Sequence, residues 1–301
     1  MKISLYEELK KILPQEKIFC EEPMSRHTTF RIGGPADYYI QPDVRQLSEV
    51  LRLADREQIP VTIIGNGSNL LVGDGGIRGV VIEIGRAMDD IRCEGQEITV
   101  GGGTLLSRLS NFAAEQGLSG LEFAAGIPGN VGGAVVMNAG AYGGEIKDVL
   151  VSVKVMDRQG GQKVLSADEL ELGYRHSRLM DTEEIVIGAV FRLKSDNPQT
   201  IRSVMADLRE RRMEKQPLEY PSAGSTFKRP QGYFAGKLIQ DAGLRGYQVG
   251  GARVSDKHCG FVVNCGGATA ADVQQLIAEI QKQVYDQFAV QLEPEVHMLG
   301  E

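Results

Sequence analysis

Apolar residues recur at helical spacing in several stretches of the chain. Residues 43–58 carry Val44, Leu47, Val50 and Leu51 on one helical face, behind Asp43, a residue type that caps helix N-termini. The same pattern predicts helices over 105–116 behind Thr104 and over 270–288 behind Thr269. Further helices are expected from the first residues to Pro14 and over the ranges 201–215 and 233–242.

Short apolar runs bounded by glycine predict strands between these helices. They cover residues 36–41, 61–64, 80–84, 98–100, 151–156, 184–193, 260–264 and 290–299. The first part has a β-α-β-like order, and the remainder mixes strands and helices irregularly, which predicts an α+β fold. We expect three pieces, over residues 1–79, 80–199 and 200–301, with a last strand that can return to the module formed by the first two.

Glycine is the unusual feature of the composition. The 301 residues include 37 glycines, and 20 of these fall between Gly65 and Gly144. Glycine serves where φ must be positive or where a backbone must approach another group closely. A stretch this dense is therefore either a flexible linker or a binding site built from backbone.

Net charge and cysteine content exclude several classes of function. The formal charge is −7, which argues against broad binding to nucleic acid or to anionic membranes. The four cysteines and four histidines have no metal-ligand spacing, so we expect no metal site. The chain has no apolar run long enough to span a membrane, and its first residues do not resemble a signal peptide, so a cytoplasmic location is expected. Oligomeric state is left open.

Two glycine-rich segments are candidates for a cofactor site. The first, Gly65-Asn66-Gly67-Ser68-Asn69, follows a buried strand, and its backbone N–H groups suit a pyrophosphate, although a simple hairpin turn explains the spacing equally well. The second runs from Gly126 to Gly144 and contains Ile127, Val131 and Val135, so it packs rather than acting as a linker. A flavin ring with a diphosphate fits the second segment, for which a tight turn packed in the core is the alternative.

Three further motifs carry candidate chemistry. Arg175, in Tyr174-Arg175-His176-Ser177, suits a carboxylate ligand, and a surface arginine is the alternative. Ser225, between Gly224 and Thr226, is a candidate nucleophile or proton donor but does not lie in a hydrolase elbow motif. Glu295, in Glu293-Pro294-Glu295-Val296, is either a catalytic carboxylate or an edge residue. Basic residues of the last piece, among them Lys237 and Arg245, slightly favour a phosphate pocket over ordinary surface charge.

Taken together, these motifs closely resemble the UDP-N-acetylenolpyruvoylglucosamine reductase family, also called UDP-N-acetylmuramate dehydrogenases. The resemblance runs from Thr28-Thr29-Phe30-Arg31-Ile32-Gly33-Gly34 to the Glu-Pro-Glu-Val end and includes Ala235–Gly243. It implies a two-part FAD-binding module of the vanillyl-alcohol-oxidase type in residues 1–199 and a UDP-sugar domain in residues 200–301. The short spacing between Arg175 and Ser225 resembles the branch that lacks an extra Tyr-bearing loop.

The resemblance also implies a reaction. NADPH reduces non-covalently bound FAD, and the hydride then passes to the enolpyruvyl group to give UDP-N-acetylmuramate, a peptidoglycan precursor. Ser225 matches the family's proton donor, and Arg175 and Glu295 match the pair that stabilises the enolate-like intermediate. The resemblance places the cofactor-binding residues in the two glycine-rich segments: Gly65, Asn66, Gly67, Ser68, Asn69, Pro128, Gly129, Gly132, Gly133 and Asn138.

Substrate binding is expected at Lys237, Arg245 and Arg229, although Arg229 stands where the other branch often has Asn. Lys237 is also a candidate partner for Ser225. Two rival functions remain open from the sequence: an FAD-dependent oxidase of the same flavin-fold class, and a nucleotide-sugar binding protein without catalytic activity.

Overall fold

The chain divides into two compact units. The computed structural model describes residues 5–301. One unit contains the residues up to Cys20 together with Tyr38–Asn66 and Gly79–Arg211, and the other contains Glu21–Asp37, Gly67–Arg78 and Arg212–Glu301. The first four residues, which the sequence pattern placed in the N-terminal helix, lie outside the described residues. The chain passes between the units after Cys20, Asp37, Asn66, Arg78 and Arg211, and the expected three-piece division at 79 and 199 stays a prediction.

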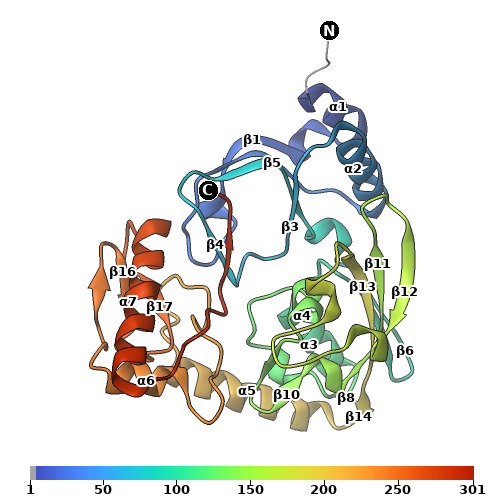
Figure 1. Cartoon of the computed structure of the whole chain (residues 1–301). Coiled ribbons are helices and arrows are strands. Elements are labelled where there is room, and N and C mark those ends of the chain that lie inside the picture. The colour runs from blue at the N-terminus through green and yellow to red at the C-terminus, as the bar shows by residue number, and fades with distance from the viewer. Residues whose placement is uncertain (1–4) are drawn as a thin grey trace. The chain divides into compact units, whose positions relative to one another are not determined.

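The N-terminal part of the first unit is a four-stranded sheet covered by two helices (Figure 1). Its strand order is β1 (Ile18–Pro23), β2 (Pro35–Ile40), β5 (Ile77–Glu83) and β3 (Val61–Ile64), and β3 runs parallel to β5. Helices α1 (Leu5–Ile12) and α2 (Val44–Glu57) bury Leu9, Leu47 and Leu51 in one core with Ile82. Asp43 caps α2 in a capping box with Gln46, which confirms the cap predicted from the sequence.

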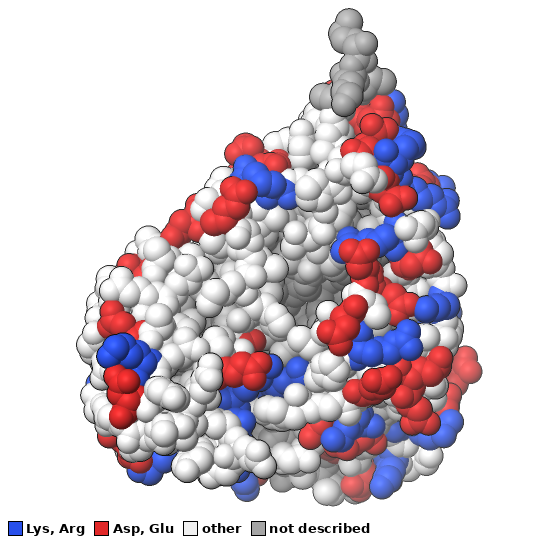
Figure 2. Space-filling model, in the orientation of Figure 1, with Lys and Arg blue, Asp and Glu red and all other residues white. Residues whose placement is uncertain are grey.

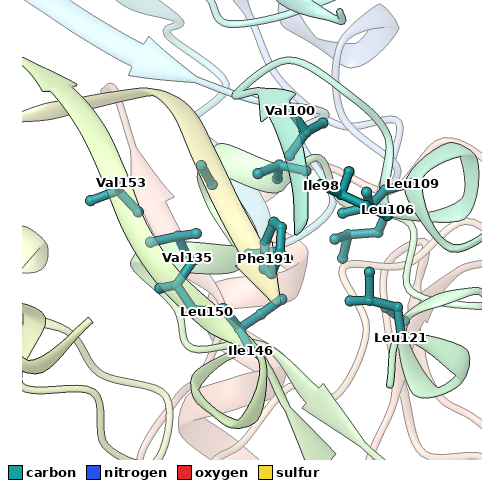
Figure 3. Packing of buried hydrophobic residues seen from close by; sticks show 14 of the residues in the cluster. Ile98, Val100, Leu106, Leu109, Leu121, Val135, Ile146, Leu150, Val153 and Phe191 are labelled. Atoms are coloured by element: carbon teal, nitrogen blue, oxygen red, sulfur yellow. The ribbon is translucent and has the colours of Figure 1, made fainter. Parts of the chain in front are cut away.

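A five-stranded antiparallel sheet forms the other part of this unit. Its order is β12 (Gln162–Ser166), β11 (Leu150–Met156), β13 (Ile185–Arg192), β7 (Glu97–Gly101) and β6 (Ile91–Glu94). Helix α4 (Val131–Val136) packs against β13 and β7, and helix α3 (Leu106–Glu115) contributes Leu106 and Leu109 to the same core. Phe191 is fully buried at the centre of this core, as Figure 3 shows.

Thr104 does not cap α3, contrary to the prediction. The helix begins one residue later than expected, behind Leu105, and no side chain accepts a hydrogen bond at its N-cap. Leu105 instead forms an isolated antiparallel bridge with Asn130, and the carbonyl of Thr104 accepts a hydrogen bond from the N–H of Val131. This tertiary pairing holds Leu105 extended, and the Thr104 hydroxyl is buried without a hydrogen-bond partner.

The second unit is built around a long C-terminal helix (Figure 1). Helix α7 (Ala270–Phe288) packs against β15 (Gln248–Val249), β16 (Ala252–Val254) and α6 (Ala235–Asp241), and β17 (Val262–Asn264) pairs with β16. Thr269 caps α7 as predicted, in a capping box with Asp272. The carboxylate of Asp74 also accepts hydrogen bonds from the N–H groups of Ala270 and Ala271, at 2.8 and 3.0 Å.

The last strand is shorter than the sequence pattern indicates. Only His297–Leu299 forms a strand, β18, and it pairs in parallel with β4 (Leu70–Val72). Segment 67–78 therefore belongs with the C-terminal residues rather than with the strand that precedes it along the chain. This pairing joins segments distant in the sequence within the second unit, and a return of the last strand to the FAD-binding module stays a prediction.

The remaining elements are short or exposed. Helix α5 (Pro198–Lys215) buries only Ile201, as its charged sequence implies. The other strands are β8 (Leu118–Ser119), β9 (Gly140–Ala141), β10 (Gly144–Glu145) and β14 (Lys194–Ser195). Short 3₁₀ turns are η1 (Gln15–Lys17), η2 (Met24–Arg26), η3 (Arg86–Met88), η4 (Glu122–Ala124), η5 (Ile146–Asp148), η6 (Asp168–Leu170) and η7 (Arg178–Met180).

Basic and acidic side chains lie next to one another on the face shown in Figure 2. That face has no broad area of a single charge, in keeping with the net charge of −7. Among residues 5–301, no helix has the length and apolar character that crossing a membrane requires.

Candidate active site

The first glycine-rich segment is a loop that leaves β3 and is held at both ends. The Asn66 side-chain amide donates to the carbonyl of Pro128, and the Asn69 amide donates to the carbonyl of Glu295 at 3.0 Å. Gly67 has a φ of 61°, and a Cβ atom there would lie 1.9 Å from the backbone oxygen of His27. Glycine is therefore required at this position by both conformation and space.

The backbone of this loop has free donors. Within residues 5–301, no group accepts a hydrogen bond from the N–H groups of Asn66, Gly67, Ser68 and Asn69. Consecutive N–H groups around a residue with positive φ form a concave anion site. Free N–H groups are what a diphosphate ligand requires, and contact of this loop with the cofactor stays a prediction.

The second segment uses its N–H groups differently. Val131 donates to the Thr104 carbonyl and Gly132 to the Gly102 carbonyl, both at 2.8 Å, and Gly133 donates to the Asn130 side chain. Because these three N–H groups at the start of α4 already donate hydrogen bonds within the protein, they are not free to bind a ligand. Pro128 and Gly133 are exposed and Gly129 is half-buried, which leaves their surfaces available for contact with a ligand. Contact of these three residues and of Gly132 with the cofactor stays a prediction.

Asn130 is a residue that the sequence analysis did not single out. Its amide donates to the carbonyl of Ile84 at 2.6 Å, and a Cβ atom on Gly65 would lie 2.3 Å from its side-chain oxygen. Asn130 therefore packs the two glycine-rich segments against each other. The available signal was its place directly before Val131-Gly132-Gly133, where an Asn caps a helix.

Arg175 lies in a tight turn in the first unit. Gly173 and His176 pair through their backbones, and Arg175, between them, has a φ of 53°. Its guanidinium donates to the carbonyl of Gly140 at 3.3 Å and lies 5.2 Å from the centre of the Tyr174 ring. A residue with a side chain in this left-handed region is strained, and such strain occurs preferentially at functional sites.

Ser225 and Glu295 are brought together in the second unit. The Glu295 N–H donates to the carbonyl of Thr226 at 2.8 Å, and Phe227 bridges to Pro294, so the two segments run side by side. Thr226 is buried, and Ser225 beside it is exposed. The Glu295 backbone is thus held by Thr226 through its N–H and by Asn69 through its carbonyl.

The predicted substrate-binding cations lie on or next to helix α6. Lys237 pairs with Asp241 one turn along the helix. Arg229 lies over the ring of Phe234, 4.0 Å from its centre, and Arg245 binds the side chain of Gln240 and the carbonyl of Asp256. Lys237 is held toward Asp241, so a contact between Lys237 and Ser225 stays a prediction.

Two neighbouring ionisable groups of the second unit, His258 and Cys259, have shifted pKa values. Among residues 5–301, no three His, Cys, Asp or Glu side chains are grouped to hold a metal ion. Burial lowers the pKa of His258 and raises that of the Cys259 thiol, so at neutral pH both groups are uncharged.

Comparison with protein families identifies both parts of the chain. Residues 36–166 match the model of an FAD binding domain, and residues 216–299 match the C-terminal domain of UDP-N-acetylenolpyruvoylglucosamine reductase. The FAD model spans the loop at Gly67 and the turn before Asn138, and the C-terminal model spans Ser225 and Glu295. The cofactor expected from the sequence is thereby confirmed as FAD.

Whole-chain relatives agree with these matches. The chain is 58% identical to UDP-N-acetylenolpyruvoylglucosamine reductase of Agathobacter rectalis, with 96% of each chain covered. It is 51% identical to the same enzyme of Lachnoclostridium phytofermentans, over 99% of this chain and 97% of that protein.

Among solved structures, the reductase from Thermus caldophilus matches with a TM-score of 0.81 and 37% identity, over 94% of this chain and 98% of that chain. The pollen allergen Phl p 4, which has glucose dehydrogenase activity, is 14% identical with a TM-score of 0.51, over 64% of this chain and 44% of that chain. The second likeness concerns the fold alone. Identity across the full length, together with both domain matches, shows that the chain belongs to the UDP-N-acetylenolpyruvoylglucosamine reductase family.

Proposed function

We propose that Ser225, Glu295 and Arg175 carry the chemistry of this enzyme, which uses NADPH and FAD to reduce the enolpyruvyl C=C bond of UDP-N-acetylglucosamine enolpyruvate. The product is UDP-N-acetylmuramate, a precursor of peptidoglycan. The observation that carries the assignment is the pairing of two segments in one unit. This assignment is supported by the hydrogen bond from the Glu295 N–H to the carbonyl of Thr226, the residue that follows the exposed Ser225.

The chemistry requires a cation, a proton and a fixed geometry. Hydride addition to the methylene carbon moves negative charge toward the substrate carboxylate, and the guanidinium of Arg175 stabilises that charge as it develops. The Ser225 hydroxyl then gives its proton to the neighbouring carbon, which completes the saturated product. Serine is a weak acid, so this transfer depends on hydrogen bonding of the hydroxyl at the site. Glu295 holds the reacting groups in position.

Backbone groups provide the cofactor site in this proposal. The free N–H groups of residues 66–69 bind the diphosphate of FAD, while Pro128, Gly129 and Gly133 contact the rest of the cofactor. Bound FAD supplies the hydride, and the protein supplies orientation and field. An acidic protein thus binds an anionic cofactor without a lysine cluster.

The substrate side rests on the C-terminal domain. Arg229, Arg245 and Lys237, all near α6, are proposed to attract the diphosphate of the UDP-sugar. The partners are these small molecules, with no nucleic acid or membrane, and the proposed location is the cytoplasm, where such precursors are made.

Spectroscopy tests the proposal directly. The purified protein is expected to be yellow, to bleach with NADPH, and to regain colour anaerobically when the enolpyruvyl substrate is added. If the protein is colourless and does not bind added FAD, the flavoenzyme is excluded and a nucleotide-sugar binding protein without catalytic activity is favoured. Rapid return of colour in air, without a response to the substrate, would indicate an oxidase.

The Ser225→Ala variant tests the role of the hydroxyl. Reduction by NADPH is expected at the wild-type rate, because that step does not use the serine, while turnover of the enolpyruvyl substrate is lost. A decrease of about 10²–10⁴-fold in the second half-reaction is typical for removal of a proton donor. Equal loss of both half-reactions would remove the assigned role.

A further inference from the structure

Asn138 lies at the junction of three segments near Arg175. Its side-chain nitrogen donates to the carbonyl of Gly173 at 2.9 Å and to the carboxylate of Glu145 at 2.7 Å, and its oxygen accepts from the N–H of Lys147 at 3.0 Å. Asn138 is fully buried. Both N–H groups of the amide and one lone pair of its oxygen are therefore taken by protein, and the fully buried side chain offers no surface to a flavin.

These hydrogen bonds contact both the turn that contains Arg175 and the strand pair that binds its guanidinium. Gly173 begins the turn in which Arg175 adopts its positive φ, so the bond to the Gly173 carbonyl fixes the base of that turn. Glu145 lies in β10, opposite Gly140 of β9, and the Gly140 carbonyl accepts from the Arg175 guanidinium. A single amide thus connects the backbone of Arg175 with the strand pair that receives its side chain.

A second buried bond supports the same turn from the other side. The Ser177 hydroxyl, fully buried, donates to the carbonyl of Val136 at 2.7 Å. Segment 173–177 is consequently attached to the end of α4 at two points. Of these, only the bond from Asn138 also reaches the strand pair that holds the guanidinium.

The backbone of Asn138 explains why this residue type occurs here. Its φ is 41°, directly after the C-cap residue of α4, in the region that Asn adopts more readily than most residues. Glycine accepts the same φ without an amide. Asn138→Gly therefore removes the side-chain amide while the backbone conformation at this position stays accessible.

We propose that Asn138 is a positioning residue, which holds the Arg175 turn so that the guanidinium faces the substrate carboxylate; this rests on the role proposed for Arg175. Loss of the amide leaves the Gly173 carbonyl with only the His176 N–H, removes one partner of the Glu145 carboxylate, and lets the strained turn relax. A displacement of about 1 Å in a catalytic group costs about 10²-fold in rate. The effect falls on the step that uses Arg175 and spares the step that does not.

The experiment separates the two half-reactions in Asn138→Gly. We expect flavin reduction by NADPH at the wild-type rate and anaerobic reoxidation by the enolpyruvyl substrate to slow about 10–100-fold. Ser110→Ala is the matched control, because Ser110 is also buried in this unit and donates to a single backbone carbonyl, that of Leu121, at 2.7 Å. It is expected to lose stability without slowing reoxidation.

A double-mutant cycle then assigns the route. In an Arg175→Ala background, Asn138→Gly is expected to slow reoxidation no further, since its effect passes through the missing guanidinium. The same slowing in both backgrounds would overturn the proposal, as would loss of FAD or of folding in Asn138→Gly. If Arg175→Ala alone leaves the rate of reoxidation unchanged, the role proposed for Arg175 is wrong. If Arg175→Ala slows reoxidation but Asn138→Gly does not, only the positioning role of Asn138 is wrong.

Discussion

Replacing Gly67 by alanine perturbs the proposed diphosphate loop at one defined point. A Cβ atom there would lie 1.9 Å from the His27 carbonyl oxygen and 2.9 Å from its carbon, and the residue has a φ of 61°. Both obstacles are backbone features, so rotation of a side chain cannot relieve them. Gly95, in the turn between β6 and β7, has the same φ but nothing within 4 Å of its Cβ position.

The pair separates conformational strain from collision. A non-glycine residue in the left-handed region costs about 1–2 kcal/mol, and the stiffer unfolded chain returns about 0.4–1 kcal/mol. Gly95→Ala is therefore expected to lower the free energy of unfolding by about 1 kcal/mol. Gly67→Ala carries the same terms, and the overlap with His27 adds about 1–3 kcal/mol, as for other overpacked sites.

The assay is urea unfolding of both apoproteins, followed by titration with FAD. Because the Gly67 backbone must move away from His27, the N–H groups of residues 66–69 no longer point toward the proposed diphosphate position. Loss of one hydrogen bond to a charged group costs about 1.5–3 kcal/mol, which weakens FAD binding about 10–100-fold. Gly95→Ala should bind FAD like the wild type. Equal stability losses in the two variants would refute the collision, and unchanged FAD affinity in Gly67→Ala would refute the diphosphate loop.

Two further predictions concern stability within the second unit. Thr269→Ala removes the hydroxyl that accepts from the Asp272 N–H at the start of α7, so we expect the free energy of unfolding in urea to fall by about 1 kcal/mol. An unchanged midpoint would mean that the Asp74 carboxylate, which accepts from the N–H groups of Ala270 and Ala271, already suffices as a cap. Burial lowers the pKa of His258 below the ordinary histidine value of 6.5, so below that pH the unfolded chain takes up a proton before the folded chain does, and stability falls on acidification. His258→Gln should flatten this fall between about pH 7.5 and pH 5.5, and an identical pH dependence in both proteins would exclude His258 as its source.

Local sequence determined most individual elements of this protein. Asp43 and Thr269 mark their helices correctly because a cap needs only a side chain and the N–H groups of the next turn. The family resemblance, carried by short motifs, gave the correct cofactor and reaction. Apolar residues within the glycine-rich segment also indicated correctly that it packs, since Val131 and Val135 are fully buried.

Only the tertiary structure decided how these pieces combine. Thr104 fails as a cap because Leu105 pairs with Asn130, and β4 joins the C-terminal strand through a parallel pairing across more than two hundred residues. No local pattern specifies such partners, because hydrogen bonds and packing between distant segments depend on the whole chain. For the same reason, the sequence marked Asn138 as part of a cofactor motif, whereas the structure shows a buried amide that ties the Arg175 turn to its neighbouring strands.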